Sequence, residues 1–355
     1  MTEAPISRRV SIIRQNLSHL LLKMVFFRLL LLKGRVTVRK LRTLTENACA
    51  YRRRAETAGA SPTVALFDVS NRCNLFCPTC RRSRTDVVDL SGQTAEQTGL
   101  GELSLERFVR IIDDLHRDLL LATLYVSGEP LLNSDLGEMV AHAGRRGVAT
   151  MLSTNGMLLD GAMSERLLDA GLDYLKVAVS GFTQDVYGIY HRGGDIETVL
   201  RNLAAFERLR RQLGKRCLVV LDYILFEHNR HQVGDLRRFC REHGIIFSLR
   251  YGRVLAGSSL ESPPESREHY LPKQRPCDWL WKIMVFCHDA RAVPCCQFAT
   301  CATSPLVMGH GDDEPAGAIW NGPSYRELRR QQARGGRRGL PLCENCFYSG
   351  IDFQS

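Results

Sequence analysis

Three cysteines, Cys73, Cys77 and Cys80, form a C-x-x-x-C-x-x-C pattern within one short loop. Three thiolates from one loop can hold three irons of a [4Fe–4S] cluster and leave the fourth iron without a protein ligand. A structural zinc site is closed by four ligands, whereas this loop supplies three cysteines with no histidine beside them. An odd number of cysteines within ten residues also argues against a disulfide. The pattern therefore predicts an iron–sulfur cluster with one iron open to a ligand.

Polar segments that contain glycine follow three apolar runs farther along the chain. They are Ser127-Gly128-Glu129-Pro130, Ser153-Thr154-Asn155-Gly156 and Ser180-Gly181. Glycine allows the backbone to approach a ligand closely. One such segment alone is typical of an ordinary turn. Their order and regular spacing after the cysteines favour a shared site.

The cysteine loop, with Asn74 and Pro78 inside it, resembles the cluster loop of the radical S-adenosylmethionine (radical SAM) superfamily. Thr79 stands where many members carry an aromatic or bulky residue, a departure that removes no ligand. The resemblance implies that the amino and carboxylate groups of SAM chelate the fourth iron. It also implies reductive cleavage of SAM to a 5′-deoxyadenosyl radical, which abstracts a hydrogen atom from a substrate C–H bond. An electron donor such as flavodoxin or ferredoxin would supply the electron.

The resemblance also indicates which residues contact SAM. The segment at Ser127 looks like the GGEP motif that binds the SAM amino group, and the segments at Ser153 and Ser180 resemble the ends of the family's third and fourth strands. Arg192 is a candidate for the SAM carboxylate or an anionic substrate group, with a solvated loop arginine as the alternative. His191 is a candidate base. The expected SAM-binding residues are Gly128, Glu129, Pro130, Ser153, Asn155, Ser180 and Arg192.

The elements that position these residues alternate between two patterns. Strand-like runs are expected at 63–69, 122–127, 148–153, 174–179, 217–226 and 245–251, and helices near 104–120, 135–146, 162–170, 195–213 and 233–243. This alternation predicts an α/β fold with a parallel sheet. The resemblance implies a partial (β/α)6 TIM-like barrel, in which active groups lie at the carboxyl ends of the strands.

A second group of cysteines lies near the end of the chain. Cys343 and Cys346 form a C-x-x-C pair, a common way to present two thiolates to one metal. The segments around Cys277 and Cys295 resemble ligand segments of the SPASM and Twitch extensions of radical SAM enzymes, which hold auxiliary [4Fe–4S] clusters. This resemblance implies one auxiliary cluster of the shorter Twitch type, held by these four cysteines, with Cys296 able to replace Cys295. A structural zinc ribbon would use the same four residues.

Cys217, Cys287, Cys296 and Cys301 are candidate hydrogen donors. A thiol that faces the substrate could return a hydrogen atom to a carbon radical, which would make the protein an epimerase. An auxiliary cluster that accepts the radical's electron would instead make it a dehydrogenase. Packing as a small buried hydrophobe is the alternative role for each cysteine.

The positive charge is concentrated at the N-terminus. Residues 1–60 carry thirteen Lys and Arg against three Glu, a net charge of +10 (13 − 3), which equals the net charge of the whole chain. Lys23 and Arg28 interrupt the apolar run at 19–33, so it falls short of the ~18 uncharged residues that a spanning helix needs. We expect an amphipathic helix on an anionic membrane surface, or a helix that packs on the open side of the barrel. Nucleic-acid binding is disfavoured because the segment has aliphatic side chains where stacking rings would be expected.

These observations divide the chain into three expected parts. They are a basic amphipathic helical extension (1–60), a radical SAM partial barrel (61–258) and a Twitch/SPASM-like auxiliary cluster domain (259–355). Thirteen cysteines and no cleavable secretory signal favour a reducing cytoplasm, with peripheral contact at the inner membrane surface.

The expected function is that of a radical SAM oxidoreductase or epimerase. Twitch enzymes of this size resemble dehydrogenases and epimerases of sugars and aminocyclitols, so we expect a small carbohydrate-like substrate from natural-product assembly. The alternative enzyme is a peptide or protein maturase. A non-enzymatic alternative, a zinc-stabilised membrane adaptor, requires the three-cysteine loop to be inert.

Overall fold

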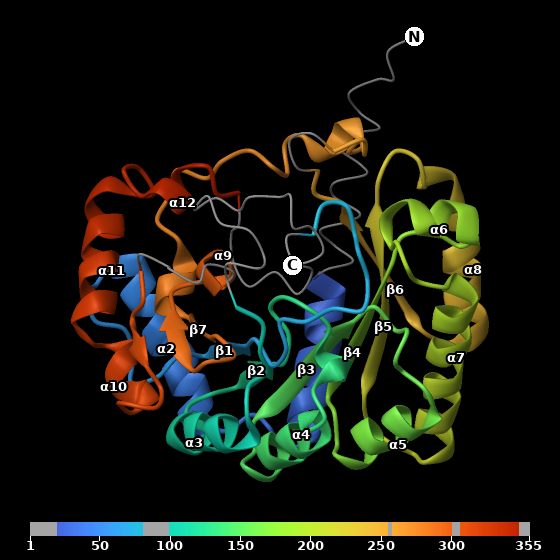
Figure 1. Ribbon diagram of the computed structural model, residues 1–355. Coiled ribbons are helices and arrows are strands. Elements are labelled where there is room, and N and C mark those ends of the chain that lie inside the picture. The colour runs from blue at the N-terminus through green and yellow to red at the C-terminus, as the bar shows by residue number, and fades with distance from the viewer. Residues whose placement is uncertain (1–19, 81–98, 255–257, 300–305, 348–355) are drawn as a thin grey trace.

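The expected parallel sheet forms the centre of the molecule. In this computed structural model, residues 20–80, 99–254, 258–299 and 306–347 are described. Six strands pair in parallel with their neighbours in chain order: β1 (Val64–Phe67), β2 (Leu121–Thr123), β3 (Ala149–Thr154), β4 (Tyr174–Val179), β5 (Leu218–Leu225) and β6 (Ile246–Tyr251). The α/β fold with a partial (β/α)6 barrel is confirmed (Figure 1).

Helices cover the outer face of this sheet. They are α3 (Leu105–Leu115), α4 (Leu136–Arg145), α5 (Gly161–Asp169), α6 (Gln184–Tyr190), α7 (Ile196–Gln212) and α8 (Val233–His243), with short 3-10 turns at Pro130–Leu132, Arg230–Gln232 and Pro264–Ser266. The side chain of Ser104 caps α3 by accepting a hydrogen bond from the Arg107 amide. The helix ends at Leu115, earlier than the expected residue 120.

The C-terminal residues extend the same sheet. Strand β7 (Ile283–Phe286) pairs in parallel with β1, and β8 (Arg291–Val293) and β9 (Gly309–His310) follow in antiparallel pairing. The remaining C-terminal elements are η6 (Asp278–Trp281), α9 (Cys296–Ala299), α10 (Ala316–Trp320), α11 (Pro323–Gly335) and α12 (Pro341–Glu344). The end of β1, where the cluster loop begins, therefore lies beside the end of β7.

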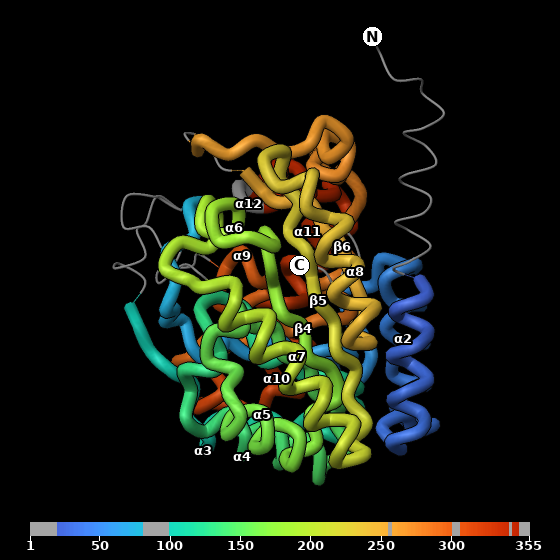
Figure 2. Tube along the Cα trace, turned by 90° about the vertical axis from the view of Figure 1, so that its right-hand side faces the viewer, coloured from blue at the N-terminus to red at the C-terminus, as the bar shows by residue number. Residues whose placement is uncertain are grey.

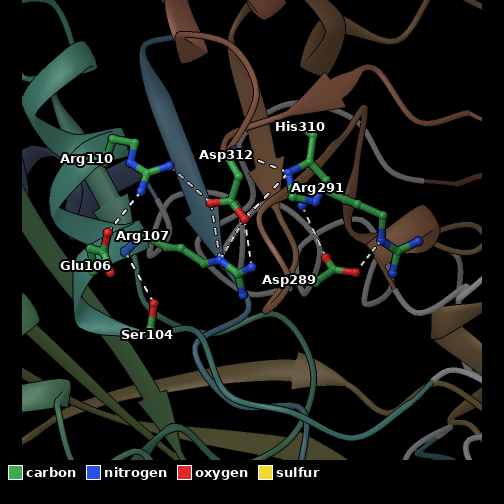
Figure 3. Close-up of polar contacts among 8 residues, drawn as sticks. All are labelled: Ser104, Glu106, Arg107, Arg110, Asp289, Arg291, His310 and Asp312. Carbon is green, nitrogen blue, oxygen red and sulfur yellow. Dashed lines mark hydrogen bonds and ion pairs between the residues drawn. The ribbon is translucent and has the colours of Figure 1, made fainter.

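Ion pairs connect this C-terminal extension to α3. Asp312 pairs with Arg107 at 2.7 Å and with Arg110 at 3.3 Å, whereas the pair of Arg291 with Asp289 at 2.5 Å lies within the extension (Figure 3). Exposed pairs of this kind each contribute little, about 0–1 kcal/mol. Both pairs to α3 use the one carboxylate of Asp312, so they attach the loop after β9 to this helix.

Two apolar cores lie on opposite faces of the sheet. Alternate residues of a strand point to opposite faces. In β4, Leu175, Val177 and Val179 pack in the outer core under the helices, whereas Tyr174 packs in the inner core. The inner core also contains Val220 of β5. The face of each strand that turns toward the barrel interior is thereby identified.

The N-terminal segment packs against the inner face. Residues 20–32 form a helix, which we call the N-terminal helix, and α2 (Val38–Arg53) follows it (Figure 2). Phe26 and Leu30 are only 3% and 2% exposed, and the Phe26 ring meets that of Tyr174 edge-on at 5.2 Å. Lys33, directly after the helix, forms a 2.5 Å ion pair with buried Asp173. The expected packing on the open side of the barrel is therefore present.

No helix in the described ranges is long and apolar enough to cross a membrane.

Candidate iron–sulfur and SAM site

The cluster loop begins at the carboxyl end of β1 and is fastened there to the turn after β2. The carboxylate of buried Asp68 accepts hydrogen bonds from the Ser127 amide at 3.0 Å and from its hydroxyl at 2.8 Å. Gly128 follows with a φ of +60°, and a Cβ atom there would lie 2.4 Å from the carbonyl oxygen of Arg72. Glycine is therefore required because two backbone segments meet at this point.

Glu129 connects the same turn to the end of β3. Its buried carboxylate accepts hydrogen bonds from the Thr154 hydroxyl at 2.7 Å, the Asn155 amide at 2.9 Å and the Leu131 amide at 3.1 Å. Burial raises the pKa of this carboxyl to about 6, because the loss of hydration outweighs the three hydrogen bonds. The side chain of Glu129 thus links the turn after β2 to the end of β3, and Pro130 beside it is buried.

Two further hydrogen bonds connect the cysteine loop to other segments of the barrel. The Asn155 amide group donates to the side-chain oxygen of Asn74 at 2.8 Å, and the Phe76 backbone N–H donates to the Arg192 carbonyl oxygen at 2.9 Å. The side chain of Arg192 is exposed. The expected SAM-contacting segments at Asn155 and Arg192 therefore both touch the loop that carries the cysteines.

The three thiols of this loop lie near one another and are largely removed from water. Burial raises the pKa of Cys77 well above its ordinary value, and the neighbouring thiols of Cys80 and Cys73 raise it further. Burial likewise raises the pKa of Cys73 to about 11. Such thiols lose their protons readily only when bound to metal, because the metal supplies the missing positive charge. The donor set therefore fits a cluster.

No group of three or more His, Cys, Asp or Glu side chains in the described ranges gathers closely enough to hold a single metal ion. In a [4Fe–4S] cluster each thiolate ligates a different iron, so the three sulfurs do not converge on one point.

His191 lies behind the site, and its ring already contacts neighbouring residues. A ring nitrogen is 2.6 Å from the hydroxyl of buried Ser180, and the ring stacks on Tyr187 with centroids 4.8 Å apart. Burial, and to a smaller degree Arg250, lowers the pKa of His191 to about 3. These contacts argue against the expected role of His191 as a base and indicate that it positions Ser180.

The structure places three charged residues in the barrel interior that were not predicted from the sequence. Lys176, Asp222 and Arg250 come from β4, β5 and β6 and share the inner face with Tyr174 and Val220. Asp222 is fully buried and pairs with Arg250 at 2.6 Å, and its Oδ1 atom has no hydrogen-bond partner within the described residues. Lys176 is 2% exposed.

Other groups place this interior set close to the cluster loop. The Lys176 ammonium lies over the ring of Tyr125, 5.1 Å from its centroid. Burial raises the pKa of the Tyr190 hydroxyl, Cys77 and Cys80 raise it further, and Arg250 and a hydrogen bond with Thr79 lower it, so Tyr190 lies near both the loop and Arg250. Half-buried Ser153 of β3 is in register with Lys176.

The four cysteines expected at an auxiliary cluster are also close together. Burial raises the pKa of Cys295 well above its ordinary value, and the thiols of Cys296, Cys277 and Cys343 raise it further. Burial raises the pKa of Cys277 to about 12, with a smaller contribution from Cys346. The three segments that carry these four cysteines therefore meet at one place.

Two buried polar residues adjoin this second cysteine group and had no signal in the sequence. The guanidinium of Arg337 donates to the Cys346 carbonyl oxygen at 2.9 Å. The side-chain oxygen of Gln332 accepts from the Cys277 amide at 2.9 Å. The Nε2 group of Gln332 is buried, and burial raises the pKa of the Cys343 thiol, a rise that a hydrogen bond from the Gln332 side chain partly offsets. A buried donor beside four thiols fits a cluster whose sulfurs would accept the hydrogen bond.

The candidate hydrogen donors lie in different places. Cys217 precedes β5, at the amino edge of the sheet, so its predicted role as a donor is wrong: the cluster loop lies at the opposite edge. Cys287 directly follows β7 at the carboxyl edge and is fully buried, with its thiol 3.7 Å from the Ala299 carbonyl oxygen. Cys296 begins α9 beside Cys295. Cys301 lies outside the described residues.

Two family models match this chain. Residues 67–240 match the radical SAM superfamily, and residues 277–347 match the SPASM iron–sulfur cluster-binding domain. The chain belongs to the radical SAM superfamily and carries a SPASM-type C-terminal domain. Its cofactors are therefore SAM and [4Fe–4S] clusters, one cluster in each domain.

Curated relatives resemble the barrel part of the chain. A PqqA peptide cyclase from Granulibacter bethesdensis is 32% identical over 168 residues, which are 47% of this chain and 41% of the relative. An Fe-coproporphyrin III synthase from Methanosarcina barkeri is 31% identical over 39% of this chain and 33% of the relative. The chain thus matches less than half the length of these two relatives.

Solved structures share the fold at low sequence identity. BtrN, solved in complex with AdoMet and 2-DOIA, has a TM-score of 0.51 at 16% identity, over 82% of this chain and 95% of BtrN. SuiB from Streptococcus suis has a TM-score of 0.59 at 13% identity, over 82% of this chain and 72% of SuiB. These likenesses support the barrel with its C-terminal extension.

Proposed function

We propose that this chain is a radical SAM oxidoreductase or epimerase that abstracts a hydrogen atom from a C–H bond of a small, polar, carbohydrate-like substrate. The observation that carries the proposal is the position of the charged interior residues Lys176, Asp222 and Arg250 beside the cluster loop. A substrate bound to them would lie close to the open iron of the cluster.

Cys73, Cys77 and Cys80 would hold the SAM-binding cluster. SAM would lie against the turn at Gly128 and the strand ends at Ser153, Asn155 and Ser180, with Arg192 available to its carboxylate. When bound, cluster and SAM supply one-electron cleavage of SAM and a radical able to take a hydrogen atom from carbon. The residues of the chain hold these groups in place and exclude water from the barrel.

The interior charges favour a substrate rich in hydroxyl or amino groups. Oδ1 of Asp222 could accept a hydrogen bond from a hydroxyl or an ammonium group, which would satisfy an oxygen that is costly to leave buried and unpaired. Lys176 could donate to a hydroxyl oxygen. A sugar or an aminocyclitol offers both kinds of group on one small ring.

The fate of the substrate radical distinguishes two versions of the proposal. In a dehydrogenase, the auxiliary cluster held by Cys277, Cys295, Cys343 and Cys346 would accept the second electron. In an epimerase, a thiol would return a hydrogen atom, and Cys287 is the candidate at the carboxyl edge of the barrel. Flavodoxin or ferredoxin would deliver the first electron in either version.

A peptide maturase is the second candidate. It is favoured by the PqqA peptide cyclases among the relatives. The buried charges inside the barrel are less suited to an extended peptide, which needs an open groove to admit its backbone.

The test is an anaerobic reconstitution followed by substrate screening. We expect about eight irons per chain, as two cubes require, and 5′-deoxyadenosine on reduction with SAM. Mass spectrometry of a sugar and aminocyclitol panel, with a peptide panel in parallel, identifies the substrate class. Loss of a hydrogen pair indicates dehydrogenation, whereas one deuterium gained from D2O without further mass change indicates epimerisation. Zinc as the only bound metal, or turnover of peptides alone, would overturn the proposal.

A further inference from the structure

The N-terminal helix is apolar on both of its sides. Its inner side contacts the barrel through Phe26 and Leu30. A second stripe lies on the side of the helix opposite the barrel. By helical spacing it comprises residues 21, 24, 25, 28, 31 and 32. Five of these are large apolar residues, and Arg28 is the sixth. We call these six residues the outer stripe.

The outer stripe is exposed to an unusual degree. Met24 and Leu32 are 59% and 57% exposed, and Leu21, Val25 and Leu31 are each about half exposed. Of the sixteen large apolar side chains that are exposed within the described residues, ten lie between Leu20 and Leu44. Contiguous apolar surface of this kind marks an interaction site, whereas scattered single residues do not.

The helix is fixed with this stripe outward. Lys33, at its end, donates to the carbonyl oxygens of Gly171 and Arg216 and pairs with Asp173. The guanidinium of Arg216 in turn donates to the Leu32 carbonyl oxygen at 3.0 Å. Turning the stripe inward would break these contacts and expose Phe26 and Leu30. These contacts therefore keep the outer stripe facing away from the barrel.

The net charge of the residues around the outer stripe indicates which kind of partner covers it. Residues 20–60 carry ten Lys and Arg against Glu46 and Glu56, a net charge of +8 (10 − 2). A second copy of this surface would repel the first. A nucleic acid would meet the charge but leave the aliphatic side chains in water. A membrane with anionic headgroups satisfies both features, since the Arg28 guanidinium can reach the phosphates while its neighbours enter the acyl boundary.

We propose that the outer stripe binds this protein peripherally to an anionic membrane surface. The N-terminal helix lies flat against the headgroups, one side in the barrel and the other in the lipid. This inference stands apart from the proposed reaction, because it uses no residue of either cysteine group and no residue of the barrel interior.

The test is co-sedimentation of the full chain with vesicles of phosphatidylcholine containing phosphatidylglycerol, or of phosphatidylcholine alone. The stripe variant combines Leu21→Gln, Met24→Gln and Leu31→Gln. Its matched control combines Leu213→Gln with Leu271→Gln, two residues that are 43% and 57% exposed elsewhere on the surface. A further variant, Arg28→Gln, tests the charge in the middle of the stripe.

We expect the wild type and the control to sediment with anionic vesicles only. The stripe variant should lower the bound fraction at least about tenfold, since burial of even one large apolar side chain can contribute that factor. High salt should weaken binding, because the Debye length falls from about 10 Å at 0.1 M to about 3 Å at 1 M. Unchanged thermal unfolding and iron content would show that the variants are folded.

Several results would overturn the proposal. They are equal sedimentation of wild type and stripe variant, equal binding to neutral vesicles, and no binding to either vesicle. Conversion of a dimer to a monomer by the stripe variant, without vesicle binding by the wild type, would show that a second copy covers the stripe. Formation of 5′-deoxyadenosine is measured separately, so failure here is distinguishable from failure of the proposed reaction.

Discussion

Asn155, at the end of β3, donates its side-chain amide to the side-chain oxygen of Asn74 across 2.8 Å. Asn74 lies between the first two cysteines of the cluster loop, so this bond joins the loop directly to a strand end expected to contact SAM. This bond therefore helps to set the position of the open iron relative to the strand ends, together with the hydrogen bond from the Phe76 amide to the Arg192 carbonyl oxygen.

Replacing either partner should loosen the loop without removing a cluster ligand. A hydrogen bond of this kind contributes about 1 kcal/mol, so we expect Asn155→Ala to lower the rate of 5′-deoxyadenosine formation several-fold with iron content unchanged. Asn74→Ala should have a similar effect, and the double variant should be little worse than either single one. Fully additive effects would show that the two amides act independently.

Cys77→Ala should abolish SAM cleavage. A cluster that loses one of three thiolates also loses the arrangement that leaves one iron for SAM. The measurement is 5′-deoxyadenosine produced by the reconstituted variant on reduction. As a control, Cys240→Ala removes a buried thiol from α8, away from both cysteine groups, and should leave the yield unchanged. A normal yield from the Cys77 variant would contradict the assignment of this loop.

Cys343→Ala combined with Cys346→Ala should remove the auxiliary cluster and leave the SAM-binding cluster in place. We expect loss of about four irons per chain, the content of one cube, with SAM cleavage still measurable because the first cysteine loop is intact. Iron analysis and 5′-deoxyadenosine assay of one preparation give both results. An iron content equal to that of the wild type would show that these cysteines bind no cluster.

Much of the barrel could be predicted because its elements are local. The run at 174–179 and the helical stretch at 233–243 have the bounds that β4 and α8 have in the structure. The pairing of β7 with β1 could not be predicted, because it joins residues more than 200 positions apart and no repeat signals it. Helix α6 was missed because its glycine and tyrosines are typical of a loop.

The sequence did contain a signal for the interior charges. Lys176, Asp222 and Arg250 each interrupt an otherwise apolar strand, and a charge inside such a strand is kept only where it is paired or used. Which face each occupies follows from strand register, and that requires the structure. The contribution of Gln332 to the auxiliary site could not be inferred, since its contact with Cys277 joins residues 55 positions apart and requires the structure.

Gln332 should tune the auxiliary cluster. Its oxygen accepts a hydrogen bond from the Cys277 amide, and its buried Nε2 group lies beside the Cys343 thiol, whose pKa is raised by burial and lowered in part by a hydrogen bond from Gln332. A donor to cluster sulfur stabilises the reduced, more negative state. We therefore expect Gln332→Glu, which keeps the acceptor and removes the donor, to lower the reduction potential of this cluster. The measurement is a redox titration followed by electron paramagnetic resonance, and an unchanged potential at full iron content would contradict this role.

Glu129 should give the protein a measurable dependence of stability on pH. Burial raises its pKa from the ordinary 4.5 to about 6, so the folded state holds the proton more tightly than the unfolded state does. The stabilising contribution of the protonated carboxyl is fully present below about pH 4.5 and is lost as the pH rises through about 6. The shift of about 1.5 pKa units corresponds to about 2 kcal/mol.

Glu129→Gln remains neutral at every pH and should remove this dependence. Its amide supplies one acceptor oxygen where the carboxylate supplies two, so the variant loses the hydrogen bond from the Asn155 amide and is destabilised at pH 5. Relative to wild type it should then recover by about 1 kcal/mol between pH 5 and pH 7.5, because only the wild type must bury a charge at the higher pH. The measurement is the midpoint of thermal unfolding across this range for wild type, Glu129→Gln and the exposed control Glu242→Gln. The control should follow the wild-type profile. Parallel profiles for wild type and Glu129→Gln would show that the carboxyl keeps an ordinary pKa in the folded protein, and that its hydrogen bonds to the end of β3 offset the cost of its burial.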